Sequence, residues 1–239
     1  SSVVQNLVVH VAPPAYTNRP PSLLADFSGA IQVLRGAQVS IAGVVAFPDA
    51  KRLWVLHKDP VSGEDVREVL ELRDGTFELK KIISLSGPFR FELEGAARVY
   101  RQKYPYTFEV KEDALPAVKI LFPQQDQEVH LDDDVGLLFE AKDDFGVVAI
   151  RRVVRIAGAG LERMRPVGSP DNEKIYSGRD RVVFRELGGR PGDVLEISYE
   201  VEDNDTVTGP KTSRSISRKF KIFSAEERHA RLLEREDQL

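Results

Sequence analysis

Short runs of alternating apolar and polar residues recur along the first part of the chain, with turn-forming residues between them. Lys51–His57, Thr76–Ile83 and Phe89–Leu93 each show the two-residue period of a strand with one buried face. The Asp74-Gly75 pair, between two such runs, is a hairpin signal. Roughly eight short strands over about 110 residues, with a turn every 8–12 residues, are typical of a β-sandwich.

A polar break ending in proline, Lys111–Pro116, separates this series of strands from a second one that runs from Val118 to Phe223. The second series shows the same alternation, with two strands, one on either side of a turn at Gly146, a loop at Pro166–Asn172 and two strand pieces within Ile175–Leu187. We therefore predict an all-β chain of two tandem Ig-like β-sandwiches, residues 1–115 and 116–223. Ser224 and Glu227 then have the spacing of a helix capping box, so residues 224–239 are expected to begin a charged helix that could mediate oligomerisation.

Two acidic corners in the second series hold the densest set of oxygen ligands. They lie in Ala141–Ile156, before Gly146, and in Leu195–Lys211. Calcium takes six to eight oxygen ligands, and corners at the end of a sandwich can supply them. The candidate calcium ligands are Asp143, Asp144, Asp203 and Asp205. The alternative is that these side chains bond the backbone of their own tight turns, as Asp and Asn commonly do.

Three arginines follow the first acidic corner. Arg151 and Arg155 share one face of the expected strand, and Arg152 lies on the other. This basic cluster is either a docking patch for a partner or one side of a set of cross-strand ion pairs.

The proline-rich segment Pro13–Pro21 excludes a helix and favours an extended conformation. It is either a ligand for the aromatic groove of a partner or a crossing between two sheets with Tyr16 packed beneath it. Tyr16 is therefore a candidate interaction residue, whereas Trp54, which alternates with Leu53 and Val55, is expected in the core.

The composition excludes several classes of protein. A net charge of −4 and a pI near 5.7, with both signs interleaved, argue against nucleic-acid binding. The chain has no cysteine, which removes disulfides and thiolate chemistry, and it has no run of about 20 apolar residues. Its four histidines are scattered without a metal-ligand spacing, so we predict no catalytic residue and no enzyme activity.

Three segments carry a resemblance: VHVAPPAYTNRPP at Val9–Pro21, AKDDFGV at Ala141–Val147, and VEDNDTVTGPKTSRS at Val201–Ser215. With them the chain resembles a bacterial family of uncharacterised membrane-anchored proteins that have Ig-like extracytoplasmic segments and a long charged, Gln-rich C-terminal tail. The resemblance implies a periplasmic location, anchored to the inner membrane through segments outside this sequence. It implies no catalytic residues.

The function expected from these observations is a non-catalytic spacer or interaction module of the cell envelope, with another envelope protein as its partner. No cofactor other than calcium is expected. Two alternatives stay open: a calcium- or carbohydrate-binding module of the adhesin kind, and an accessory domain of a hydrolase.

Overall fold

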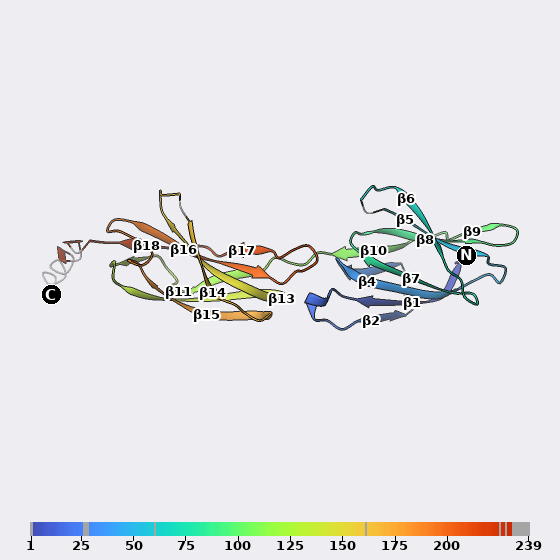
Figure 1. The fold of residues 1–239 in the computed structure, drawn as a ribbon, viewed down its shortest axis with the longest axis horizontal. Coiled ribbons are helices and arrows are strands. Elements are labelled where there is room, and N and C mark those ends of the chain that lie inside the picture. Colours follow the sequence, from blue (N-terminus) through green and yellow to red (C-terminus); the bar gives the residue numbers. More distant parts are fainter. Residues whose placement is uncertain are drawn as a thin grey trace. The chain divides into compact units, whose positions relative to one another are not determined.

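The computed structural model describes residues 2–25, 29–59, 61–160, 162–224, 226–227 and 229–230. Their regular structure consists mainly of β-strands, which confirms the all-β class (Figure 1). The chain divides into two compact units, Ser1–Asp113 and Ala114–Leu239, each with its own hydrophobic core. No helix within the described part of the chain has the length and apolar character of a membrane span.

The first layer of unit 1 is an antiparallel sheet with the strand order β2-β1-β4-β7. Its members are β1 (Val4–Ala12), β2 (Ser22–Ala25), β4 (Ala37–Val45) and β7 (Thr76–Ile83). The second layer has the order β3-β10-β8-β5-β6, with β9 paired to β8 and with β3 and β10 parallel. Its members are β3 (Ala30–Leu34), β5 (Arg52–Lys58), β6 (Asp65–Leu70), β8 (Gly87–Glu94), β9 (Val99–Arg101) and β10 (Tyr106–Lys111).

Alternation decides which side chains fill the space between these layers. On β5, Leu53 and Val55 are buried in the core, as the two-residue period requires. Trp54 belongs to the opposite row, where it is half-buried, and the Arg67 guanidinium lies 4.1 Å from the centre of its ring. The expectation that Trp54 lies in the core was therefore wrong, because its two buried neighbours define the inner face.

The proline-rich segment joins two strands of the same sheet. It contains the 3₁₀ turn η1 (Ala15–Thr17), and the strands on either side of it pair antiparallel, with Val11 opposite Ser22. The predicted crossing between sheets at this segment was wrong. Tyr16 is half-buried in the turn, beside the buried Thr17.

The Asp74-Gly75 pair forms the tight turn that its sequence predicts. Both residues have positive φ, 50° and 75°, and backbone bonds of 3.0 and 2.9 Å join Arg73 and Thr76. The strands on either side of the turn, however, belong to different layers: β6 pairs with β5 and β7 pairs with β4. The turn therefore connects the edges of two sheets.

Unit 2 is organised around one long strand, β13 (Asp134–Ile156). Its first half pairs with β11 and β15, and its second half pairs with β14 and β16. The remaining strands continue from β16 in the order β18-β12, with β17 also on β16. The other strands of unit 2 are β11 (Ala117–Phe122), β12 (Gln127–Val129), β14 (Glu162–Gly168), β15 (Glu173–Val183), β16 (Val194–Asp203), β17 (Thr212–Arg214) and β18 (Arg218–Ile222).

Unit 2 departs from the sequence prediction in three places. The two strands expected on either side of Gly146 are one continuous strand that changes partners there. The loop expected from Pro166 overlaps β14, which continues to Gly168 with Pro166 near its end, a placement that an edge strand tolerates. Finally, β15 is a single strand where two pieces were expected.

The expected C-terminal helix lies mostly outside the described residues. At its start, the Ser224 N–H donates to Glu227 Oε2 at 2.8 Å and the Glu227 N–H donates to Ser224 Oγ at 3.2 Å. These two bonds are those of a capping box.

Candidate functional site

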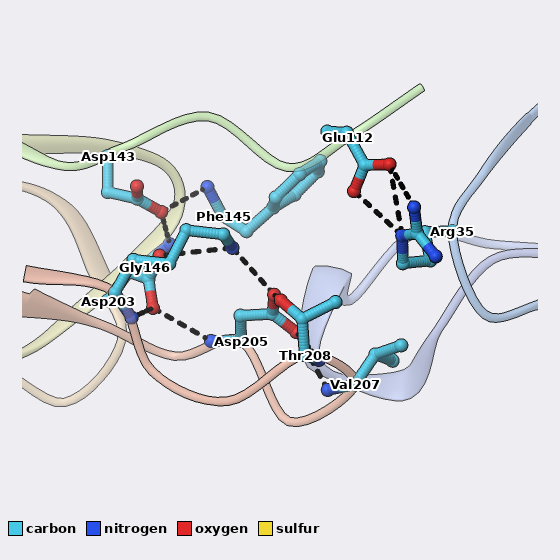
Figure 2. Close-up of polar contacts among 10 residues, drawn as sticks. Arg35, Glu112, Asp143, Phe145, Gly146, Asp203, Asp205, Val207 and Thr208 are labelled. Carbon is cyan, nitrogen blue, oxygen red and sulfur yellow. Dashed lines mark hydrogen bonds and ion pairs between the residues drawn. The ribbon is translucent and has the colours of Figure 1, made fainter. Parts of the chain in front are cut away.

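The first acidic corner lies where β13 changes partners (Figure 2). Asp143 is buried, and its Oδ2 accepts the N–H groups of Phe145 at 2.8 Å and Gly146 at 2.7 Å. Residue 146 must be glycine, because a Cβ there would lie 2.8 Å from the Asn172 carbonyl oxygen and 2.9 Å from Asn204 Nδ2. The Asp143 carboxylate thus stabilises the register shift within β13, and the absence of a side chain at Gly146 lets the segments of Asn172 and Asn204 approach the strand closely.

The second corner follows β16 and is held by two buried carboxylates. Asp203 Oδ1 accepts the N–H groups of Asp205 at 3.2 Å and Lys211 at 2.8 Å. Asp205 Oδ1 accepts the N–H groups of Val207 at 2.7 Å and Thr208 at 3.1 Å (Figure 2). These are the local backbone bonds by which aspartate side chains stabilise turns.

A lysine supplies the positive charge at the second corner. The Lys211 Nζ lies 2.6 Å from Asp205 Oδ2 and 3.6 Å from Asp203 Oδ2. Burial disfavours the ionised form of Asp205, but hydrogen bonds from Lys211, Thr208 and the Val207 N–H outweigh it and lower the pKa of this carboxyl to about 2. The Lys211 ammonium therefore already neutralises the carboxylates of the second corner.

The structure assembles only part of the predicted calcium set. Asp143, Asp203 and Asp205 are buried at their corners, and β13 meets β16 there through Val147 and Asp203, whereas Asp144 is exposed. Across the described residues, no group of three or more acidic or histidine side chains is arranged to hold a metal ion. The Asp132–Asp134 turn is separate: Asp132 pairs with Arg185, Asp133 accepts the His130 N–H, and Asp134 pairs with Arg181.

The outer face of β13 and β16 carries a ladder of ion pairs. Arg151 Nη2 lies 2.6 Å from Glu202 Oε2, and Arg155 Nε lies 2.9 Å from Glu196 Oε2. Arg214 on β17 continues the ladder, 2.9 Å from Glu200. The hydrogen bonds that Arg151 donates to Glu202 and Arg155 donates to Glu196 raise the pKa of both arginines above the usual value. On this face the basic cluster forms cross-strand ion pairs.

Arg152 points the other way, into the core of unit 2. It is 4% exposed, and its Nη1 lies 3.0 Å from each carboxylate oxygen of Asp180 on β15. The fully buried Tyr199 donates its hydroxyl to Asp180 Oδ2 at 3.0 Å and stacks on Phe139 at 4.4 Å between ring centres. Burial and the neighbouring Asp180 charge raise the pKa of Tyr199. Arg152 is thus half of a buried ion pair that joins strands from both halves of the unit.

Several charged groups escaped the sequence reasoning. Asp180 lies 28 residues from Arg152, so no local pattern identifies it as the partner. Lys211, in contrast, lies six residues from Asp205 and within the segment that forms the second corner, and its charge was a local signal. In unit 1, His57, Glu68 and Lys81 form a cluster with contacts of 2.7–2.8 Å between the layers. The alternation of apolar and polar residues did indicate this cluster. Lys81 lies on the same inward-facing row of its strand as Leu79 and Ile83, and His57 lies on the same inward-facing row as Val55.

Comparison with known proteins does not assign the chain to a family. No family model matches it, and no curated protein matches it. Among solved structures it is similar to the fibronectin(III)-like modules of Clostridium thermocellum CbhA, with 12% identity, a TM-score of 0.31, and coverage of 84% of this chain and 93% of that one.

Two further solved structures have comparable similarity. A chimeric titin Z1Z2 tandem is 11% identical, with a TM-score of 0.28 and coverage of 82% of this chain and 96% of that one. An ICAM-5 D1–D4 ectodomain fragment is 12% identical, with a TM-score of 0.35 and coverage of 92% and 52%. Similarity of this degree carries no argument about activity, so the fold class rests on the strands themselves.

Proposed function

We propose that this chain is a non-catalytic spacer and interaction module of a periplasmic envelope protein that is anchored to the inner membrane elsewhere in its sequence. The observation that carries the proposal is how the charged groups of unit 2 are used. The buried aspartates of its corners bond the backbone of their own segments, and its arginines hold neighbouring strands together. These are contributions to stiffness rather than to the activation of a substrate.

A stiff module of this kind suits a spacer, which holds other domains of the same protein apart or presents them to a partner. Each unit has its own core, and unit 2 adds ion pairs across β13, β16 and β17. The resemblance of the AKDDFGV and VEDNDTVTGPK segments to membrane-anchored bacterial proteins supports the periplasmic part of the proposal. In the structure these segments build the two corners of unit 2.

Edge strands offer a route for recruiting a partner. Within the described residues β15 pairs only with β13, so its other edge is open to strand addition by an extended segment of another envelope protein. Its outward row includes the exposed Ile175 and Arg179. Charged residues along such an edge also limit indiscriminate pairing.

The test is an affinity capture from envelope extract, using the chain with and without Ser224–Leu239. A partner retained by both versions, and cross-linked to β15, supports recognition by the β units. A partner lost with the C-terminal segment assigns recognition to that segment and leaves the β units as spacers. Failure of both versions to capture any envelope protein above a denatured control contradicts the interaction role.

Calcium binding is retained as a second candidate because of one atom. Asp143 Oδ1 is buried and has no hydrogen-bond partner among the described residues, and such an oxygen is available to a cation. The Lys211 ammonium, which neutralises the second corner, opposes this candidate. We expect the melting temperature to be the same in millimolar calcium and in EDTA. A calcium-dependent rise that is lost in Asp143→Asn would establish the calcium-binding alternative.

A further inference from the structure

Unit 1 contains a cleft of about 360 Å³ between its two layers. It opens beside the edge strand β7, under the loops that follow β5 and β7, and it reaches core side chains. Its apolar wall includes Val55, Leu79 and Ile83, and at its base Phe89 and Phe108 stack with 4.6 Å between ring centres. A cleft of this size with a mainly apolar lining is the usual form of a small-molecule site.

Charged groups gather along the same cleft. His57, Lys58, Asp59 and Lys81 belong to its lining. The carboxylate of Asp59 is engaged locally, since its Oδ1 accepts the N–H groups of Val61 at 2.8 Å and Ser62 at 2.7 Å. These two bonds lower the pKa of Asp59, which keeps it ionised in place.

The acids that pair with the two lysines come from β6 rather than from the wall of the cleft. Lys81 Nζ lies 2.7 Å from Glu68 Oε1, and Lys58 Nζ lies 3.2 Å from Asp65 Oδ1. Each ammonium group of the lining is thus neutralised by an acid of β6, so an anionic ligand can pair with one of these lysines only by taking the place of its acid. The ligand group that can replace a carboxylate beside an ammonium is another anion, and a second carboxylate matches it in shape and charge.

The cluster already shows how a carboxylate would be held. Glu68 Oε1 lies 2.8 Å from His57 Nε2 as well as 2.7 Å from Lys81 Nζ. His57 Nδ1 lies 3.0 Å from the Lys58 carbonyl oxygen, and we assign its proton to that bond, so Nε2 accepts from the Lys81 ammonium at 2.7 Å and donates no bond to Glu68. Lys81 is therefore oriented from two sides.

Glu68 is the replaceable member of this cluster. Its side chain is 41% exposed and comes from the edge strand β6, whereas those of His57 and Lys81 are 17% and 23% exposed. A Glu68 carboxylate that swings outward is solvated by water, so its displacement by a second carboxylate exchanges one ion pair for another. Lys81 then points its charge into the cleft.

We propose that this cleft binds a small amphipathic carboxylate. Its apolar body packs against Leu79, Phe89 and Phe108, and its carboxylate takes the position of Glu68 beside Lys81. Neither group suffices alone: the aromatic floor contributes burial, and the ammonium contributes a charge-assisted hydrogen bond. The site does not depend on the spacer role, because it lies within unit 1 and needs no protein partner.

The test is calorimetric titration of the full chain with octanoate, octan-1-ol and octylamine. Octanoate is expected to bind at least about tenfold more tightly than the other two, because only it forms the charge-assisted bond. Lys81→Met removes that bond at similar side-chain length, and we expect octanoate affinity to fall about tenfold or more. Lys80→Met is the matched control: Lys80 is the next residue of β7, faces outward and pairs with Glu78, so affinity should stay within about twofold.

Backbone amide shifts of the unmodified chain give a second readout that needs no variant. Octanoate should shift the resonances of Leu79–Leu85 and of Phe108 while leaving those of unit 2 in place. Equal binding of octanoate and octanol, equal weakening by the two lysine variants, or shifts confined to other surfaces would each overturn the proposal. So would the absence of binding at millimolar octanoate.

Discussion

Both units have a cationic side chain on the inward row of a strand, Arg152 in unit 2 and Lys81 in unit 1, but only Arg152 is buried together with its partner. In unit 2, Arg152 and its partner Asp180 have side chains that are 5% and 10% exposed, and Tyr199 closes the site with a further bond to Asp180. In unit 1, Lys81 and its partner Glu68 are 23% and 41% exposed at the mouth of a cleft.

The difference lies in what covers each ion pair. Arg152 lies between the two halves of unit 2, where strands β13, β15 and β16 exclude water around it. Lys81 lies on β7, the edge strand of one sheet, and its partner Glu68 lies on β6, the edge strand of the other, at the cleft between the two layers. A buried charged side chain must keep its partner, because an uncompensated charge in the interior costs several kcal/mol of stability. A partly exposed charged side chain can exchange its partner, because water solvates it in between.

Neutralising the acid of each ion pair should give the largest difference in stability between the buried pair of unit 2 and the partly exposed pair of unit 1. Asp180→Asn leaves the buried Arg152 without a counter-ion, and we expect unit 2 to lose about 4 kcal/mol of unfolding free energy. Glu68→Gln should lower that of unit 1 by less than about 1 kcal/mol, because water replaces the lost partner. Hydrogen exchange against denaturant measures both units, and the fluorescence of Trp54, the single tryptophan, reports on unit 1. Equal losses would show that burial does not distinguish the two pairs.

A glycine substitution tests how tightly the corner of unit 2 is packed compared with the strand that leads to it. Gly146→Ala places a methyl group against the Asn172 backbone and Asn204, and we expect a loss of about 3 kcal/mol because the backbone cannot move aside. Gly136→Ala is the control on the same strand, where nothing lies within 4 Å of the new Cβ. Thermal unfolding of the two variants should differ clearly, and similar midpoints would refute the close packing at Gly146.

Acid should weaken the second corner of unit 2 through Asp205. The pKa of this carboxyl is about 2 in the folded chain and 3.8 in the reference state, so folding is favoured by the ionised form. The stabilisation, about 2 kcal/mol, is present above pH 4 and is lost as the pH falls through 2. Denaturant titrations at several pH values measure this slope. Asp205→Asn should flatten that dependence, and a slope that survives in the variant would assign it to other carboxyl groups.

Much of the architecture follows from local patterns in the sequence. Alternation identified most strands and assigned Arg151 and Arg155 to the face opposite Arg152. Aspartate and glycine identified the positions of the corners, although at the first one Asp143 and Gly146 mark a register shift within the continuous strand β13 and not the turn that was expected. These features depend on residues a few positions apart, which is the range over which backbone geometry and short side chains act.

The partners of the charged groups could not be predicted in this way. Asp180 lies 28 residues from Arg152, and Lys81 lies 24 residues from His57, so each contact depends on which strands become neighbours. The calcium hypothesis treated the corner aspartates as anions in need of a cation. It did not take into account the Lys211 ammonium, which neutralises the second corner.

The sequence by itself determined the all-β class, the positions of most turns and the two faces of each strand, because side-chain period and turn chemistry are local properties. Only the tertiary structure decided that β1 and β2 share a sheet, that the Asp74-Gly75 turn sends β6 and β7 into different layers, and that β13 serves both halves of unit 2. The period of a strand specifies which residues share a face. It does not specify which face is buried or which strand lies alongside, since these depend on the packing of segments far apart in the chain.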